Sequence, residues 1–401
     1  MNNQTFLQEA QALSDEIISN RRHLHRNPEL SFYEYNTSAY IQNKLSEMGI
    51  TSTVMATTGV IAEIGHGERC VALRADIDAL PIEEETGLEF ASLNKGVMHA
   101  CGHDAHTSML LGAAKILKNH EHELSGIVKL IFQPGEEKVP GGASILIKEG
   151  VLTNPAPEVI FGQHVFPGNP VGESSFVAGS MMASADELYW TIRGKGCHAA
   201  QPHQGIDPIL VAAELIMHLQ SIITKIRNPL APGVLAITSI HGGTVTNIVP
   251  DTVELKGTLR SFDNEWRYLA LAEIKKRSEM IAEMHGAICE FNPLIGYPPL
   301  VNNQVAVNFA RKTAESIFGE ETVSDFEPKM WGEDFSFYAQ EIPACFWVMG
   351  VRPLELDEMP GLHNAHFTPD EDALASGTAL LVSVATEWLK NPNPFLDNGK
   401  S

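Results

Sequence analysis

The spacing of apolar residues predicts helices and strands that alternate along the first part of the chain. Apolar residues recur at helical spacing from Leu7 to Leu24, which predicts a helix over 5–26 that ends at Asn27-Pro28. The same patterning predicts helices over 35–48, 103–118 and 142–152, and strands over 59–65, 69–78, 126–134 and 158–165. Strands that alternate with helices indicate an α/β layer structure with a mostly parallel sheet.

The pattern changes near residue 186. The expected order there is strand 187–194, helix 207–226, strands 233–243 and 247–262, helix 265–286 and strand 287–294. This βαββαβ order is typical of a ferredoxin-like domain. The α/β pattern then resumes with helix 302–318, strand 344–351 and helix 370–389. We therefore expect a discontinuous main domain, 1–185 and 297–401, with an inserted domain at 186–296.

Composition and charge narrow the classes of function. The 401 residues carry a formal net charge of −22, which would repel nucleic acid and anionic membranes. We expect no membrane association, because no apolar run reaches the length of a membrane span. The N-terminus lacks the pattern of a signal peptide. Five widely spaced cysteines without a Cys-x-x-Cys pair predict a reducing, cytoplasmic location.

Residues that bind metals follow the expected main-domain strands. In open α/β sheets, ligands bind beyond the carboxyl ends of the strands. The residues expected at that edge are Arg74, Asp76, Asp78, Glu136, Glu137 and His164, joined by Cys101 and His103 before one helix and by His363 and His366 before the last. Cysteine, histidine and carboxylate together suit Zn²⁺ best, with Mn²⁺, Co²⁺ and Ni²⁺ as alternatives. Of the adjacent Glu136 and Glu137, one can bind metal while the other serves as general base.

Each of these residues also has an ordinary structural interpretation. Cys101 alone would be a small buried hydrophobe, but His103 two positions later favours ligation. His164 by itself could equally be a hydrogen-bonded core histidine, and Asp104 is expected to cap the following helix. Cys101 as a nucleophile paired with His103 is disfavoured, because residues two apart at a turn rarely form that hydrogen bond.

Several motifs resemble one known family along nearly the whole chain. They are RRHLHRNPELSFYE (21–34), LRADIDALPI (73–82), MHACGHDAHTSMLLGAA (98–114), FQPGEE, GQHV, GKGCHAAQPHQGIDPI, TNIVPD and LHNAHFTPDED. In this order they resemble the aminoacylase/carboxypeptidase family of dinuclear metallohydrolases. The most similar branch holds hippurate hydrolases, N-acetyl-amino-acid deacetylases and plant auxin-conjugate hydrolases.

The resemblance implies a site for two divalent metal ions. Its ligands would be Cys101, His103, Glu137, His164 and His363, with Cys101 bridging the metals. Glu136 would be the general base for a metal-activated water, and Asp76 would orient a ligand. His198 in the inserted domain would stabilise the oxyanion in the active site of a neighbouring subunit. Asn247 and Arg260 are weaker candidates for binding the substrate carboxylate.

The resemblance also implies the reaction and the assembly. The expected substrate is a small N-acyl amino acid, cleaved to a carboxylic acid and a free amino acid, and the inserted domain would serve as lid and dimerisation domain. A dipeptidase or carboxypeptidase of the same family is the alternative; a thiol hydrolase and a non-catalytic binding protein are further hypotheses. One position departs from the wider family: Arg74 stands where a metal-binding histidine is expected, so His103 would take over that role.

Overall fold

The computed structural model describes residues 3–395. The chain divides into two compact units. Unit 1 comprises Met1–Met181, Val301–Pro328 and Asp334–Ser401, and unit 2 comprises Met182–Leu300 and Lys329–Glu333. The sequence predicted boundaries near 186 and 296 between domains that fold independently. Independent folding is a different property from compactness, so these domain boundaries stay a prediction.

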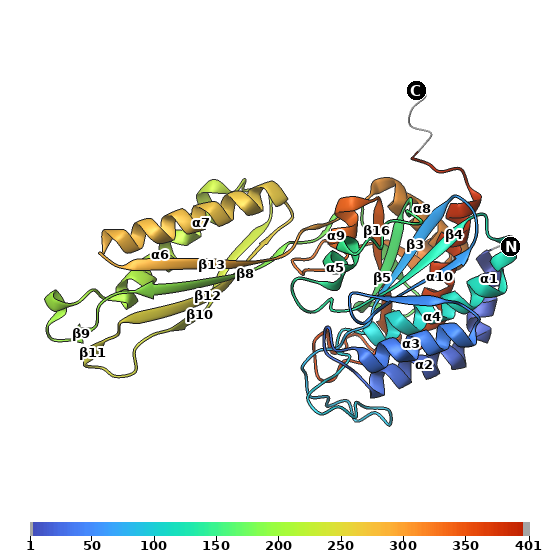
Figure 1. Ribbon diagram of the computed structural model, residues 1–401, viewed down its shortest axis with the longest axis horizontal. Coiled ribbons are helices and arrows are strands. Elements are labelled where there is room, and N and C mark those ends of the chain that lie inside the picture. The colour runs from blue at the N-terminus through green and yellow to red at the C-terminus, as the bar shows by residue number, and fades with distance from the viewer. Residues whose placement is uncertain (1–2, 396–401) are drawn as a thin grey trace. The chain divides into compact units, whose positions relative to one another are not determined.

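Unit 1 is built on one eight-stranded sheet (Figure 1). Its strands, in spatial order, are β1 (Ser52–Met55), β2 (Gly59–Gly65), β4 (Ile127–Gln133), β3 (Cys70–Asp76), β5 (Ile160–Pro170), β16 (Ala344–Arg352), β6 (Ser174–Phe176) and β15 (Val323–Asp325). The central strands β4, β3, β5 and β16 pair in parallel. All seven residues of β3 are buried, as expected for a strand covered on both faces. The α/β class with a mostly parallel sheet is confirmed.

Helices cover this sheet and complete the core of unit 1. They are α1 (Asn3–Ala12), α2 (Ser14–Arg26), α3 (Tyr35–Glu47), α4 (His103–Asn119), α5 (Gly142–Lys148), α8 (Gln304–Phe318), α9 (Ser336–Glu341) and α10 (Ala373–Lys390). Helix α10 packs against α1, α4 and α8, and it also contacts β3, β5 and β16. Helices α4 and α10 are buried nearly all round because they lie between the sheet and other helices. Helix α4 also contacts β2, β3, β4 and β5, so it lies against the centre of the sheet.

Two expected elements are each divided in the structure. The helix expected over 5–26 is interrupted at Leu13, whose φ of −95° and ψ of 4° depart from helical values. Its apolar spacing continues across the interruption because both α1 and α2 pack on the same core. The strand expected over 247–262 becomes β11 (Ile248–Val249) and β12 (Thr252–Ser261), since Pro250 cannot donate a ladder hydrogen bond.

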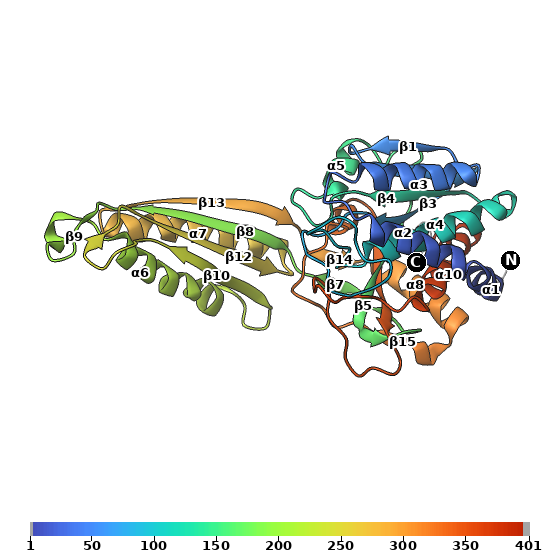
Figure 2. The same ribbon diagram turned by 90° about the horizontal axis from the view of Figure 1, so that it is seen from below.

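Unit 2 is a four-stranded antiparallel sheet with two helices on one face (Figures 1 and 2). Its spatial order is β10 (Gly233–His241), β12, β8 (Ala185–Arg193) and β13 (Ile288–Tyr297). Helices α6 (Pro208–Ser221) and α7 (Asn264–Met284) pack on that sheet and on each other. Within unit 2, β9 (Cys197–His198) pairs with β11, whereas β7 (Gly179–Met182) and β14 (Leu300–Asn302) pair with each other mostly in unit 1. The chain order β8-α6-β10-β12-α7-β13 is the expected βαββαβ order.

Helix α6 corrects one expectation drawn from the sequence. Together with the π-helical turn Ile222–Ile226, it forms a segment, Pro208–Ile226, that is long and apolar enough to cross a membrane by length and composition. The expectation that no apolar run has this length was therefore wrong. Helix α6 buries Val211, Leu215 and Leu219 against the sheet of unit 2, which is the pattern of an amphipathic surface helix.

Candidate active site

The carboxyl ends of β3, β4 and β5 bring a group of titratable side chains together in unit 1. Asp76 ends β3, Glu136 and Glu137 follow β4, and His164 lies within β5. Cys101 and His103 come from the start of α4, where Gly102 has a φ of +86°. A Cβ at Gly102 would lie 2.4 Å from Val165 Cγ2, so both the backbone conformation and the packing require glycine there.

All five ligands expected from the sequence lie in overlapping clusters within unit 1. Ligand atoms of Cys101, His103 and His164 lie within 4.8 Å of one another, and so do those of Cys101, Glu137 and His363. Cys101 Sγ lies 3.3 Å from His164 Nε2, and Glu137 Oε1 lies 3.2 Å from His363 Nε2. Cys101 is common to both clusters. Each of the two groups has donor atoms that could hold a cation.

The His103 ring is oriented by a carboxylate behind it. His103 Nδ1 lies 3.2 Å from Asp78 Oδ1, which leaves Nε2 to face the cluster. Among the residues that the structure describes, His103 Nε2 is buried and makes no hydrogen bond. Buried polar atoms without a partner are rare, and an absent ion is one of their ordinary explanations. The residues present therefore fit a metal site.

His106 does not belong to the ligand set, although it lies close to Asp76 and His103. Its Nδ1 lies 2.6 Å from Asp76 Oδ1, and its Nε2 accepts the Val165 N–H at 2.9 Å. Since Nε2 accepts, the proton of the neutral ring is on Nδ1 and is donated to Asp76. Both ring nitrogens are thus occupied. Asp76 is in turn held by Arg74, so it supports the cluster from behind.

The electrostatics of the cluster favour a cation. Burial, followed by the charges of Glu137 and Glu136, raises the pKa of the Cys101 thiol well above its usual range. A thiolate at this position therefore needs a positive charge beside it. Burial lowers the pKa of His103, but Asp76 and Asp78 outweigh burial and raise that pKa to about 10. Burial, then His106, holds the pKa of His164 well below its usual range, which keeps that ring neutral as ligation requires.

Glu136 lies beside the ligands on the loop after β4. Ligand atoms of Glu136, Glu137 and His103 lie within 4.8 Å of one another, and the Glu136 side chain is buried. The Asp334 N–H donates to Glu136 Oε1 at 3.4 Å. Glu136 and Glu137 thus both lie near His103, but their other neighbours differ.

Three carboxylates make contacts that the sequence did not predict. Asp78 orients His103, and Asp334 accepts hydrogen bonds from Arg74 and Gln133. Asp104 was expected to cap α4, but its carboxylate instead accepts from Arg21 and lies 2.9 Å from His25 Nδ1. Their partners are distant in sequence, so no local spacing could reveal these contacts.

The three candidates in unit 2 fall into two places. Ile248 pairs with His198, and the Ala199 N–H donates to the Asn247 carbonyl, so His198 and Asn247 lie together. Figure 1 shows β9 and β11 at one end of the unit. Arg260 lies near the opposite end of β12, about 26 Å along the strand from Thr252. One copy of unit 2 therefore does not bring Arg260 and His198 together.

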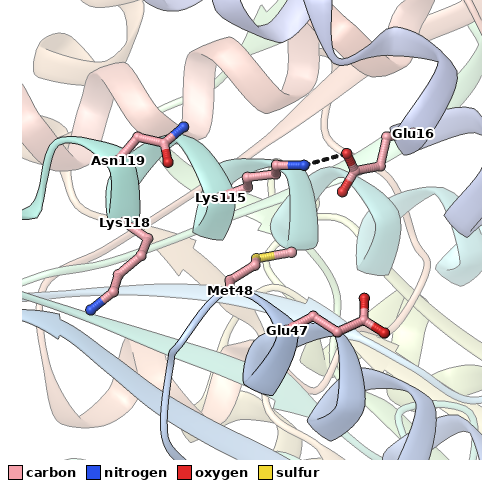
Figure 3. A pocket seen from close by; sticks show the side chains of 6 residues that line it. All are labelled: Glu16, Glu47, Met48, Lys115, Lys118 and Asn119. Atoms are coloured by element: carbon pink, nitrogen blue, oxygen red, sulfur yellow. Dashed lines mark hydrogen bonds and ion pairs between the residues drawn. The ribbon is translucent and has the colours of Figure 1, made fainter.

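A surface hollow of about 320 Å³ lies elsewhere in unit 1 (Figure 3). Its lining residues are Glu16, Glu47, Met48, Lys115, Lys118 and Asn119. Lys115 is already paired with Glu16, and none of the six lining residues belongs to the metal-binding cluster. It has no part in the chemistry of the cluster.

Comparison with known proteins identifies the family of this chain. The description "Peptidase family M20/M25/M40" matches residues 72–387. The chain belongs to this family. The match confirms the family resemblance drawn from the motifs, and M20 enzymes are hydrolases, so the chain is a metal-binding hydrolase that acts on amide bonds.

Similar family members span nearly the whole chain. An N-acetyl-L-cysteine deacetylase of Bacillus subtilis (strain 168) is 41% identical, over 94% of this chain and 89% of the relative. The IAA-amino acid hydrolase ILR1-like 4 of Arabidopsis thaliana is 38% identical, over 94% and 86%. A solved structure of the Bacillus subtilis protein YxeP, a dinuclear metal-binding peptidase of the M20 family, has a TM-score of 0.81 at 37% identity and covers 95% of this chain and 99% of that one.

Proposed function

We propose that this M20 enzyme hydrolyses the amide bond of N-acyl amino acids with a pair of divalent metal ions. The observation that carries the proposal is the double cluster around Cys101, with Glu136 beside it. The activities named for the deacetylase and the IAA-amino acid hydrolase support this substrate class. Cys101, His103, Glu137, His164 and His363 would hold the metals, and Zn²⁺ suits this donor set best.

The metal ions, when bound, would polarise the amide carbonyl and lower the pKa of water. Glu136 would take the proton of the attacking water and return it to the leaving amine. Asp78 and Asp76 would keep His103 and His106 in fixed orientations. His198 Nδ1 accepts the Ala200 N–H, so its proton is on Nε2, which is free to donate to a developing oxyanion.

We further propose that the enzyme is a cytoplasmic homodimer associated through unit 2. All five cysteines are free, in keeping with a reducing compartment. The separation of Arg260 from His198 and Asn247 supports a site completed by His198 of the partner subunit. Helix α6 exposes Leu210 and Met217 at helical spacing, which gives the dimer an apolar surface. Sedimentation of wild type and Met217→Glu tests this; a wild-type monomer at all concentrations would contradict it.

The function is tested with metal-loaded wild type, Glu136→Gln and Glu68→Gln, a control at an exposed carboxylate. The substrates are N-acetyl, N-benzoyl and indole-acetyl amino acids together with dipeptides. We expect Glu136→Gln to bind metal normally and to lose roughly 10²–10⁴-fold in kcat. A chelator should abolish wild-type activity, and Zn²⁺, Mn²⁺ or Co²⁺ should restore it.

Each alternative predicts a different result in the same experiment. Turnover of dipeptides alone would favour a peptidase, the class to which YxeP is assigned. Full activity of the metal-free protein would contradict the metal mechanism, and a trapped acyl-Cys101 would favour a thiol hydrolase. No turnover of any amide, with ligand binding intact, would favour a binding protein.

A further inference from the structure

The segment Ser31-Phe32-Tyr33-Glu34 belongs to a motif that the metal mechanism does not use. It connects α2 to α3 and passes directly behind the loop that carries Glu136 and Glu137. Glu34 has no exposed surface and is the residue before α3. A carboxyl group shielded from water needs hydrogen-bond donors from the protein. Its donors therefore show which part of the structure Glu34 stabilises.

Glu34 meets the backbone of the catalytic loop. Glu34 Oε1 accepts the Gly135 N–H at 2.8 Å, and Glu34 Oε2 accepts the Thr58 hydroxyl at 2.7 Å. Gly135 immediately precedes Glu136. Both atoms of the Gly135 contact are shielded from water, which strengthens the hydrogen bond, so Glu34 holds that amide in place.

The amide on the other side of Glu136 is held in the same way. The Glu137 N–H donates to Asp78 Oδ2 at 2.9 Å, and the Ser31 hydroxyl donates to the same oxygen at 2.6 Å. Two buried carboxylates therefore fix the backbone immediately before and after Glu136. One of these carboxylates, Glu34, belongs to the segment 31–34, and the other, Asp78, accepts a hydrogen bond from Ser31 of that segment.

Phe32 adds a packing contact to these hydrogen bonds. Its φ of 67° lies in the left-handed region, which is strained for a large side chain. A Cβ at Gly135 would lie 2.4 Å from Phe32 Cε1, so the ring packs directly against the Gly135 backbone. Strained residues of this kind persist where the surrounding structure holds them, often beside functional sites.

We propose that Glu34 is a positioning residue for this enzyme: by accepting the Gly135 N–H it fixes the backbone from which Glu136 reaches the substrate water. The inference rests on the proposed function of Glu136 as general base. Glu34 lies outside the candidate metal-binding groups. Its loss should therefore change the rate of the chemical step more than substrate or metal binding.

The test compares Glu34→Ala, Glu34→Gln and Thr58→Val in the full, metal-loaded chain. Glu34→Ala removes the acceptor for Gly135. Glu34→Gln keeps a carbonyl oxygen at the same place and serves as conservative rescue. Thr58→Val removes the other hydrogen bond of the same carboxylate and leaves the Gly135 contact, which makes it the matched control for general destabilisation.

We expect Glu34→Ala to lower kcat by about 10–100-fold, with KM and metal content near wild type, because small misplacement of a catalytic group has effects of this size. Glu34→Gln and Thr58→Val should stay within about threefold of wild type in kcat. If Glu34→Ala is too unstable to purify, Glu34→Met fills similar volume without a carbonyl acceptor and must show the same loss. Equal kcat in all variants, or equal losses in Glu34→Ala and Thr58→Val, would overturn the proposal.

A second measurement is independent of catalysis. Hydrogen exchange of the Gly135 amide, followed without substrate, should accelerate in Glu34→Ala and stay slow in Glu34→Gln. Unchanged exchange in Glu34→Ala would refute the anchoring contact even if the enzyme hydrolyses N-acyl amino acids as proposed. Accelerated exchange in an enzyme that hydrolyses none of them would refute only the proposed function.

Discussion

Glu34 is fully buried and ionisable, so its environment makes a prediction about stability. Burial, with the nearby charge of Asp78, raises its pKa from 4.5 to about 7. The folded state therefore binds the Glu34 proton more tightly than the unfolded state does. The resulting stability is fully present below pH 4.5 and is lost as the pH rises through 7.

Glu34→Gln removes this titration. We expect the variant to gain up to about 3 kcal/mol over wild type as the pH rises from 4.5 to 8, at 1.36 kcal/mol per pKa unit. Urea unfolding of both metal-free proteins at several pH values measures the change. A difference between the two proteins that does not vary with pH would show that Glu34 titrates normally.

Gly102 separates Cys101 from His103 and makes a second prediction at this scale. Alanine there would be strained by the φ of +86° and would clash with Val165. We expect Gly102→Ala to misplace both ligands, to weaken metal binding and to lower kcat about 100-fold. Gly87→Ala is the matched control, because Gly87 has a φ of +71° but open space around it. Metal content and kcat of the two variants decide whether position 102 matters beyond backbone strain.

The residues of the cluster differ in how far their surroundings could be predicted from sequence. Glu136 and Glu137 follow a predicted strand, and Cys101 and His103 stand at the start of a predicted helix, so their convergence at one sheet edge follows from the topology. The role of His106 depends on its Asp76 and Val165 contacts, which no spacing encodes. The same holds for Glu34, whose partner lies 101 residues away.

At the scale of elements, periodicity predicted the long helices and buried strands well. It failed where an element is short or sits at an edge: β1, β6, β15 and β14 have three or four residues each, too few for a period to show. The kinked pair α1 and α2 also has a continuous apolar pattern. Tertiary packing, rather than local preference, decides such cases.

The attachment of α2 to α4 is tested by a pair of neighbouring arginines. Arg21 is buried and its Nε donates to Asp104 at 2.9 Å, whereas the Arg22 side chain is 49% exposed. Both arginines also contact Glu371. Arg21→Met leaves the buried Asp104 charge with His25 alone, which should destabilise the protein by about 3–5 kcal/mol. Arg22→Met removes an exposed pair and should cost at most about 1 kcal/mol. Urea denaturation followed by circular dichroism compares them; equal losses would show that Asp104 does not depend on Arg21.

At the scale of the whole molecule, the net charge of −22 acts on every substrate that approaches. An N-acyl amino acid carries a carboxylate, so the negative net charge of the protein repels it at long range. Metal ions bound in the site would attract it only at short range. Salt weakens the long-range repulsion more than the short-range attraction, since the Debye length falls from about 30 Å at 0.01 M to about 8 Å at 0.15 M ionic strength. Charges in a partly buried site are screened much less.

Raising the ionic strength over this range should therefore increase kcat/KM for an N-acetyl amino acid, by about twofold or more, through faster association. The amide of the same N-acetyl amino acid is the control, because it lacks the carboxylate and should show little change. Initial rates at substrate concentrations well below KM measure both ratios. A decrease for the carboxylate substrate alone would mean that the cationic field of the site extends farther than the acidic surface does, and that substrate is drawn in rather than repelled.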